Sequence, residues 1–297
     1  MRTWVLLVLF CGAGAWCGEG AVTAPGAQLE KLADGFKFAE GGSADADGNV
    51  YFTDQPNDRI HKWDVAAKKL STFLEPCGRS NGTHFDAQGN LLACADEKNE
   101  LWSIGPQGRH TVLVKDFGGK RLNGPNDLWI RPDGGLYFSD PFYKRPYWQR
   151  GPMEQDVQAV YFLPADRSAP KRVVNDLVQP NGLTGTPDGK TLYVADIGAR
   201  KTYAFDIQAD GALTGKRLFC ELGSDGVTID AEGNVYLTGK GVTVFDKTGR
   251  QIEHIPVPEG WVGNVCFGGQ DRQTLFVMAS KGLYSIRMRV KGANPNK

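Results

Sequence analysis

Six short apolar runs recur along the chain, and each follows a polar segment that is rich in Asp, Asn and Gly. Runs of this length behind Asp-Gly and Glu-Gly turns predict β-strands joined in hairpins, because glycine accepts the positive φ that such turns need. The six runs are Val50–Thr53, Leu91–Cys94, Leu136–Ser139, Leu192–Ala195, Val235–Thr238 and Leu275–Met278.

Each polar segment opens with a side chain that carries an oxygen, and in five of the six a glycine stands eight residues later. We call these first residues the openers: Glu40, Asn81, Asn126, Asn181, Asp225 and Asn264. Successive openers are 41, 45, 55, 44 and 39 residues apart. A repeat of about 40 to 45 residues with four strands is the period of a propeller blade. The pattern therefore predicts an all-β fold, a six-bladed β-propeller.

The last repeat is incomplete. It begins at Asn264, and few residues follow Met288, so it lacks room for an outermost strand. Residues 29–38 precede the first repeat and could supply that strand. Closure of this kind hides sheet edges that would otherwise pair with other chains. We expect the N-terminal strand to complete the sixth blade of a propeller domain over residues 23–297.

The first residues indicate export. A short basic start, an apolar stretch and the small residues Ala13-Gly14-Ala15 are typical of a secretory signal peptide, which we assign to residues 1–22. The apolar stretch is too short to span a bilayer comfortably. We expect an exported protein, periplasmic or extracellular, that is a monomer free of the membrane after cleavage.

Composition removes other classes of function. Lys and Arg total 34, as do Asp and Glu, so there is no basic excess to attract nucleic acid or an anionic membrane. The sequence contains no HExxH or P-loop motif, which leaves zinc protease and NTPase chemistry without support. Four cysteines remain after cleavage, and both a Cys77–Cys94 disulfide and buried free thiols stay open.

The topology brings the openers together. The innermost strand of each blade lines the axis, and each opener stands just before it, so all six should form a ring on one face. Carboxylate and amide oxygens are hard ligands that suit Ca²⁺ or Mg²⁺, and Glu40 and Asp225 would balance a divalent charge. The alternative is that each opener hydrogen-bonds its own loop. Six matched positions favour a metal site.

Several short motifs resemble the SMP-30/gluconolactonase/LRE family of six-bladed propellers. They are Glu40-Gly41, Asn123-Gly-Pro-Asn-Asp127 with Leu136–Pro141, Pro180-Asn-Gly182, Ser224-Asp-Gly226 and Phe267-Gly-Gly269. The resemblance implies one divalent cation, commonly Ca²⁺, with Mg²⁺, Mn²⁺ or Zn²⁺ as alternatives. It also implies a Glu, two Asn and an Asp as ligands, which here are Glu40, Asn126, Asn181 and Asp225. Gly42 replaces the proline that usually follows Glu-Gly.

The function implied is metal-dependent hydrolysis of a cyclic ester, a carboxylic ester hydrolase of the gluconolactonase kind with a polyhydroxy lactone as its small-molecule substrate. The cation would polarise the carbonyl. Asp225 is the candidate general base, and direct nucleophilic attack by Asp225 remains open. An organophosphate hydrolase or strictosidine-synthase-like enzyme is one rival reading. A non-catalytic exported binding propeller is the other.

Further residues are candidates for contacts with substrate: Asn81, Asn264, Arg79, Asn123 and Tyr143. The 55-residue spacing contains an insertion, residues 141–157, that should emerge beside the ring as a lid or specificity wall. An ordinary surface loop is its alternative. His84 could face the axis or simply be packed. Three aspartates that end second strands could orient ligands or satisfy loop amides: Asp54, Asp140 and Asp196.

Overall fold

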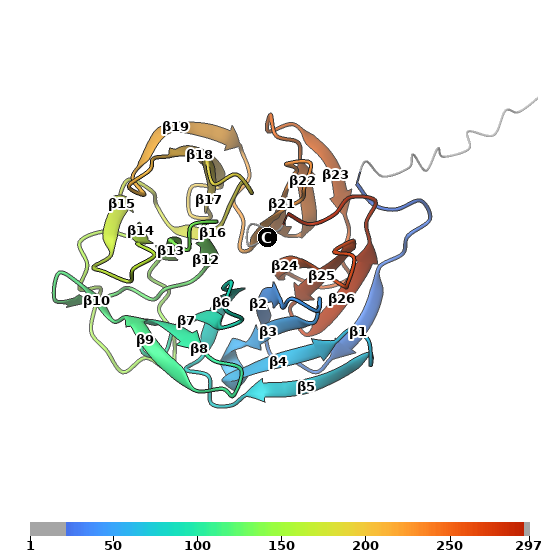
Figure 1. Cartoon of the computed structure of the whole chain (residues 1–297), viewed down its shortest axis with the longest axis horizontal. Helices are drawn as coiled ribbons and strands as arrows, with labels where there is room; N and C mark the ends of the chain where they lie inside the picture. Colours follow the sequence, from blue (N-terminus) through green and yellow to red (C-terminus); the bar gives the residue numbers. More distant parts are fainter. Residues whose placement is uncertain (1–21, 294–297) are drawn as a thin grey trace, which may run out of the picture.

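The computed structural model describes residues 22–293, and the signal peptide predicted for residues 1–22 lies almost wholly outside them. Six four-stranded antiparallel sheets surround a central axis, as predicted (Figure 1). Each sheet is one blade, numbered in chain order from its innermost strand.

The strand bounds are as follows. Blade 1 contains β2 (Ala39–Ala44), β3 (Val50–Asp54), β4 (Arg59–Asp64) and β5 (Lys69–Leu74), with the 3-10 turn η1 (Gln55–Asn57). Blade 2 contains β6 (Ser80–Phe85), β7 (Leu91–Ala95), β8 (Glu100–Ile104) and β9 (His110–Val114). Blade 3 contains β12 (Leu128–Ile130), β13 (Leu136–Asp140), β14 (Ala159–Leu163) and β15 (Lys171–Val174). A small hairpin, β10 (Asp116–Phe117) and β11 (Lys120–Arg121), precedes blade 3.

The second half repeats the arrangement. Blade 4 contains β16 (Pro180–Gly185), β17 (Thr191–Asp196), β18 (Lys201–Ile207) and β19 (Leu213–Cys220). Blade 5 contains β20 (Val227–Ile229), β21 (Val235–Gly239), β22 (Gly241–Phe245) and β23 (Gln251–Ile255). Blade 6 contains β24 (Val262–Gly268), β25 (Thr274–Ala279), β26 (Gly282–Arg287) and β1 (Glu30–Asp34).

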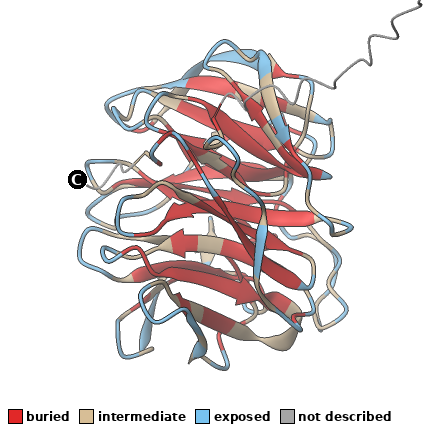
Figure 2. Ribbon diagram, turned by 90° about the vertical axis from the view of Figure 1, so that its right-hand side faces the viewer, coloured by how far each residue is buried: buried red, intermediate tan, exposed pale blue. Residues whose placement is uncertain are grey.

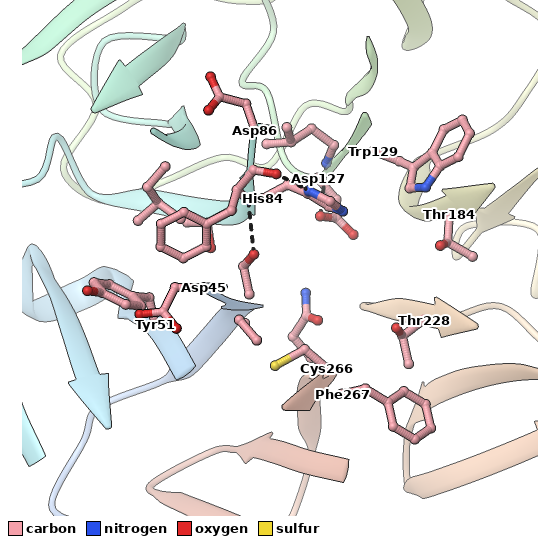
Figure 3. Close-up of a pocket in the computed structure, with 18 of the residues that line it drawn as sticks. Asp45, Tyr51, His84, Asp86, Asp127, Trp129, Thr184, Thr228, Cys266 and Phe267 are labelled. Carbon is pink, nitrogen blue, oxygen red and sulfur yellow. Dashed lines mark hydrogen bonds between the residues drawn. The ribbon is translucent and has the colours of Figure 1, made fainter. Parts of the chain in front are cut away.

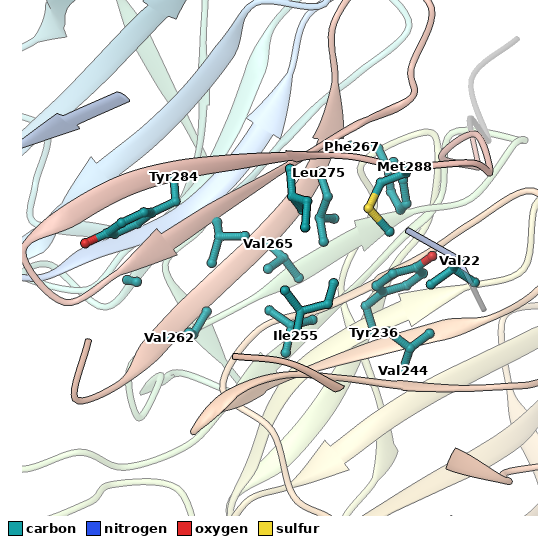
Figure 4. Packing of buried hydrophobic residues seen from close by; sticks show 14 of the residues in the cluster. Val22, Tyr236, Val244, Ile255, Val262, Val265, Phe267, Leu275, Tyr284 and Met288 are labelled. Carbon is teal, nitrogen blue, oxygen red and sulfur yellow. The ribbon is translucent and has the colours of Figure 1, made fainter. Parts of the chain in front are cut away.

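The two ends of the described chain close the ring. β1 pairs antiparallel with β26, Glu30 opposite Ser285 and Asp34 opposite Gly282, so the N-terminal strand completes the sixth blade as predicted. Val22 is 1% exposed and packs with Met288 and Tyr236 between blades 5 and 6 (Figure 4). The packed propeller therefore includes Val22, one residue before the predicted start of the domain.

Apolar packing lies between the blades. In residues 22–293 there are six apolar clusters, one between each pair of neighbouring blades. Successive residues of a second strand serve different clusters: Leu91 packs towards blade 1 and Leu92 towards blade 3. These strands are buried on both faces, which explains why their sequences are continuous apolar runs. Figure 2 shows the buried strand interiors between exposed loops at the two faces.

The cysteines follow the same division. Cys77 packs in the cluster between blades 1 and 2, whereas Cys94 packs between blades 2 and 3. Both are free, as are Cys220 and Cys266, and all four are buried. Of the two alternatives left open by the sequence, the structure has free thiols. Among the described residues, no helix has the length and apolar character needed to cross a membrane.

Glycines have different roles at the two faces of the propeller. The five glycines that stand eight residues after an opener adopt φ between 69° and 88° and turn the chain between first and second strands. At the opposite face, glycines beside the openers allow close approach to the axis. A Cβ on Gly182 would lie 2.2 Å from the Asp225 carbonyl oxygen, and one on Gly41 would lie 1.9 Å from the Asn81 carbonyl oxygen. Opener and glycine together let neighbouring blades converge.

This convergence can be tested with Gly182→Ala. We expect the free energy of unfolding to fall by roughly 1–3 kcal/mol, because overpacking against backbone cannot be relieved by a side-chain rotation. Gly151→Ala is the matched control, since a Cβ there meets nothing within 4 Å. Denaturant unfolding should show the loss in Gly182→Ala only. Equal stability of the two variants would contradict the account.

Candidate active site on the propeller axis

A cavity of about 280 Å³ lies on the axis at the opener face. It is walled by residues of several blades and of the blade 3 insertion: Phe38, Glu40, Gln55, Asn81, Asn126, Tyr143, Arg145, Ile197, Asp225 and Trp261. Of the predicted site residues, the structure therefore brings Glu40, Asn81, Asn126, Asp225 and Tyr143 into one pocket. Asn181 joins them through hydrogen bonds to Asp225 and Tyr143.

Four of these side chains carry an oxygen without a hydrogen-bond partner in the structure. They are Glu40 Oε2, Asn81 Oδ1, Asn126 Oδ1 and Asn181 Oδ1, all buried. Buried polar atoms are almost always satisfied, and each exception needs an explanation. Three of these residues line the cavity, and the unpaired oxygens can accept from hydrogen-bond donors or bind a cation.

Asp225 is held by two donors. Trp261 Nε1 donates to Asp225 Oδ2 at 2.7 Å, and Asn181 Nδ2 donates to Asp225 Oδ1 at 3.0 Å. Asn181 Nδ2 also donates to the Tyr143 hydroxyl oxygen at 2.6 Å. The amide group of Asn181 is thereby fixed, and its oxygen is left as the free end.

Two carboxyl groups share the pocket, and both are perturbed. Burial, the charge of Asp225 and the charge of Asp127 raise the pKa of Glu40 well above its usual value. Burial raises the pKa of Asp225, while hydrogen bonds from Trp261 and Asn181 oppose the shift. Like charges in a confined site disfavour simultaneous ionisation. A cation between them would remove that cost.

Three aspartates brace the chain just before an opener. Asp54 accepts the backbone amides of Lys37 and Phe38, ahead of Glu40. Asp140 accepts those of residues 123 and 124, ahead of Asn126, and Asp196 accepts those of residues 178 and 179, ahead of Asn181. These carboxylates satisfy loop amides, the alternative reading in the sequence. By these hydrogen bonds they fix the backbone that leads to Glu40, Asn126 and Asn181.

The blade 3 insertion forms part of the pocket wall. It leaves β13 at the opener face and brings Tyr143 and Arg145 to the cavity, the position expected from the strand directions. Burial and nearby Asp225 raise the pKa of the Tyr143 phenol, so this hydroxyl keeps its proton and can donate to a ligand.

Other predicted residues lie elsewhere. Arg79 donates to the Pro56 carbonyl oxygen and stacks on Tyr147, and Asn123 donates to backbone oxygens at 140 and 157. Neither lines the axial cavity, and both support the insertion or its base.

Asn264 lies on the other side of the ring. It lines a second cavity of about 470 Å³ at the opposite end of the axis. Figure 3 shows this cavity with His84 in its wall. Its Oδ1 accepts the backbone amide of Val265, as expected for an opener that satisfies its own loop. A contact between Asn264 and a ligand in the opener-face cavity therefore lacks support from its position.

Four wall residues were not among the residues predicted from the sequence: Phe38, Gln55, Ile197 and Trp261. A positional signal for them existed. Gln55 and Ile197 directly follow the aspartates that end second strands, and this topology returns such positions to the ring. Phe38 and Trp261 stand two and three residues before an opener. Phe38, Ile197 and Trp261 were not identified because apolar residues are usually assigned to the core.

The donor set fits a hard divalent cation. Among residues 22–293 there is no group of three or more His, Cys, Asp and Glu side chains suited to a metal. The axial pocket instead offers two carboxylates and amide oxygens, a set typical of Ca²⁺ or Mg²⁺ sites. The orphaned oxygens of Glu40, Asn126 and Asn181 match three of the four predicted ligands.

Comparisons with known proteins agree with the fold. A family model described as the SMP-30/gluconolactonase/LRE-like region matches residues 38–281. A gluconolactonase from Zymomonas mobilis is 27% identical, with 89% of this chain and 82% of that protein covered. A pentonolactonase from Haloferax volcanii is 30% identical, with 78% of each covered. The solved structure of a gluconolactonase from Xanthomonas campestris superposes with a TM-score of 0.84 at 31% identity, covering 92% of this chain and 95% of that one.

The buried charge in the pocket can be tested with Glu40→Gln in cation-free protein. The folded-state pKa of Glu40 lies above its unfolded value, so the wild type loses stability as the pH rises between the two. Gln removes that loss. We expect the variant to be more stable by roughly 1–3 kcal/mol at pH 8 and to show no difference near pH 4.

Thermal unfolding across that pH range, with chelator present, is the measurement. Glu232→Gln is the control, because Glu232 is exposed and its carboxylate should contribute little. A wild type that is more stable than Glu40→Gln at pH 8 without cation would contradict a strained, charge-bearing pocket.

Proposed function

The chain belongs to the SMP-30/gluconolactonase/LRE-like family, and we propose that its axial pocket hydrolyses sugar lactones with one divalent cation, most simply Ca²⁺. One observation carries the proposal: orphaned oxygens from separate blades converge on a single cavity that also holds Asp225. The names of the similar proteins, gluconolactonase and pentonolactonase, support a lactone as substrate.

Glu40, Asn126, Asn181 and Asp225 would hold the cation. Bound there, it would supply Lewis-acid polarisation of an ester carbonyl and compensate the two carboxylates. Asn81 presents an unpaired amide oxygen to the same cavity and can accept a hydrogen bond from a substrate hydroxyl.

The residues of the chain divide the remaining work. Trp261 and Asn181 fix both oxygens of Asp225, so its carboxylate has one orientation towards the cavity. Ionised Asp225 can take a proton from water as a general base, or attack the carbonyl carbon itself. Tyr143 keeps its hydroxyl proton and can donate a hydrogen bond to an oxygen of the substrate. Phe38 and Ile197 supply apolar surface that limits access of bulk water.

A phosphotriester hydrolase would use the same cation and the same fold, and an exported binding propeller would need neither Asp225 nor an activating cation. The unpaired amide and carboxylate oxygens in the pocket favour a hydroxylated substrate over a phosphotriester. Export, which the predicted signal peptide indicates, and a monomeric state are part of the proposal.

Hydrolysis of glucono-δ-lactone, followed by acid release at constant pH, tests the proposal. We expect turnover with Ca²⁺, its loss with chelator, and little activity on a phosphotriester. The same Ca²⁺ should raise the Tm, because ligand at 100 times its Kd stabilises the folded state by about 2.7 kcal/mol. Turnover that persists unchanged after chelation would contradict the role of the cation.

The variant Asp225→Asn tests the role of the Asp225 carboxylate in the reaction. We expect at least a hundredfold loss of kcat, since a general base or nucleophile contributes about that much or more. Full activity in this variant would falsify the role of Asp225. Single turnover of the wild type in H₂¹⁸O gives evidence on the mechanism. Label in the peptide that contains Asp225 requires direct attack followed by hydrolysis at the Asp225 carbonyl, whereas a general base places label only in the product acid.

A further inference from the structure

Blade 2 departs from its neighbours at one position. In blades 1 and 4 the residue paired with the position just before the opener is an aspartate, Asp54 or Asp196. The corresponding residue of blade 2 is Ala95, paired with Ser80. An aspartate follows one residue later, as Asp96. Because Asp96 stands one residue later, its carboxylate does not accept the backbone amides ahead of Asn81, the opener of blade 2.

The Asp96 carboxylate instead holds the blade 3 insertion. Its Oδ2 accepts from Arg145 Nε at 3.1 Å, from the Tyr147 hydroxyl, and from Gln55 Nε2 at 3.2 Å. Its backbone oxygen accepts from Trp148 Nε1 at 2.9 Å. One residue of blade 2 therefore fixes three side chains of the insertion, and the Asp96 side chain is only 3% exposed.

The close contact is built into the backbone as well. Gly124 has φ +153°, and a Cβ there would lie 2.7 Å from Asp96 Oδ1 and 2.9 Å from the Trp148 ring. Only glycine lets the segment ahead of Asn126 pass beside this contact. The insertion is thus seated against blades 2 and 3 by both shape and charge.

Arg145 is the part of the insertion that this contact aims at the pocket. Its side chain lines the cavity, is 22% exposed, and stacks over the Tyr143 ring at 4.7 Å. Asp96 engages only Nε, so the two terminal nitrogens stay available as donors. A guanidinium held at one end and stacked on a ring loses little entropy when it binds a ligand.

We propose that Asp96 is a positioning residue that fixes Arg145 as a donor to the hydroxyl oxygens of the substrate, so that this contact makes the enzyme selective for polyhydroxylated lactones. The inference rests on the proposed lactonase function. Asp96 balances the charge of Arg145, which suits donation to neutral hydroxyls better than capture of an anion. A site built to hydrogen-bond hydroxyls penalises analogues that lack them, because its polar groups are then left unpaired.

The test compares glucono-δ-lactone with δ-valerolactone, which has the same ring and no hydroxyls. For Asp96→Asn and Arg145→Gln we expect KM for glucono-δ-lactone to rise roughly ten- to hundredfold, the effect of losing charged hydrogen bonds. The kcat should change far less, and kcat/KM for δ-valerolactone should stay within about threefold. Arg145→Lys should recover part of the loss, because it keeps a donor without the fork.

Asp156→Asn is the matched control. It removes an ion pair between an aspartate of the same insertion and an arginine of β15, Asp156 with Arg172 at 2.7 Å. The Asp156 side chain is 68% exposed and lies outside the pocket. Its kinetics should equal those of the wild type. Thermal unfolding accompanies each variant, and Arg145→Gln carries the test if Asp96→Asn unfolds.

Three outcomes overturn the inference. Equal losses on both lactones would show that Asp96 and Arg145 only maintain the structure. Unchanged KM in Arg145→Gln would remove its contact with substrate. A wild type that hydrolyses neither lactone would refute the proposed function itself and the inference with it. The wild-type rate alone distinguishes this outcome from the other two outcomes.

Discussion

The central feature of the structure is a group of buried oxygens without hydrogen-bond partners at the centre of the propeller. Two carboxyl groups and several amide oxygens are buried on the axis where protein donors do not reach all of them. Desolvation and mutual repulsion make this arrangement costly, which is why the pKa of Glu40 is raised so far. A bound cation would offset that cost. Under the proposed function, residues that would be a defect in a structural core would serve as the ligands of that cation.

Several groups of residues hold the side chains of this centre in place. Apolar clusters between blades fix the six inner strands, and glycines beside the openers let those strands approach the axis. Asp54, Asp140 and Asp196 tie down the segments that lead to three openers. The insertion closes one side. Each layer is built from elements distant in sequence, so the pocket exists only when the ring is complete.

The periodic part of this arrangement was predictable. Opener, glycine turn and apolar run recur in a fixed order, and together they define the blades, the closing strand and the side of the axis where Glu40 and Asp225 meet. Two features were not. The side of the ring that Asn264 faces depends on strand register at the axis, and the partners of Asp96 depend on how an irregular loop folds back. Neither has a period in the sequence, because side-chain packing across blades decides both.

The most direct test of the account is an anomalous diffraction map of crystals grown with Ca²⁺ or a heavier divalent ion. The account predicts one peak on the axis at the opener face, with oxygens of Glu40, Asn126, Asn181 and Asp225 at about 2.3–2.6 Å, the usual calcium distances. A pocket without a peak at saturating cation, or a peak bound by other residues, would contradict it.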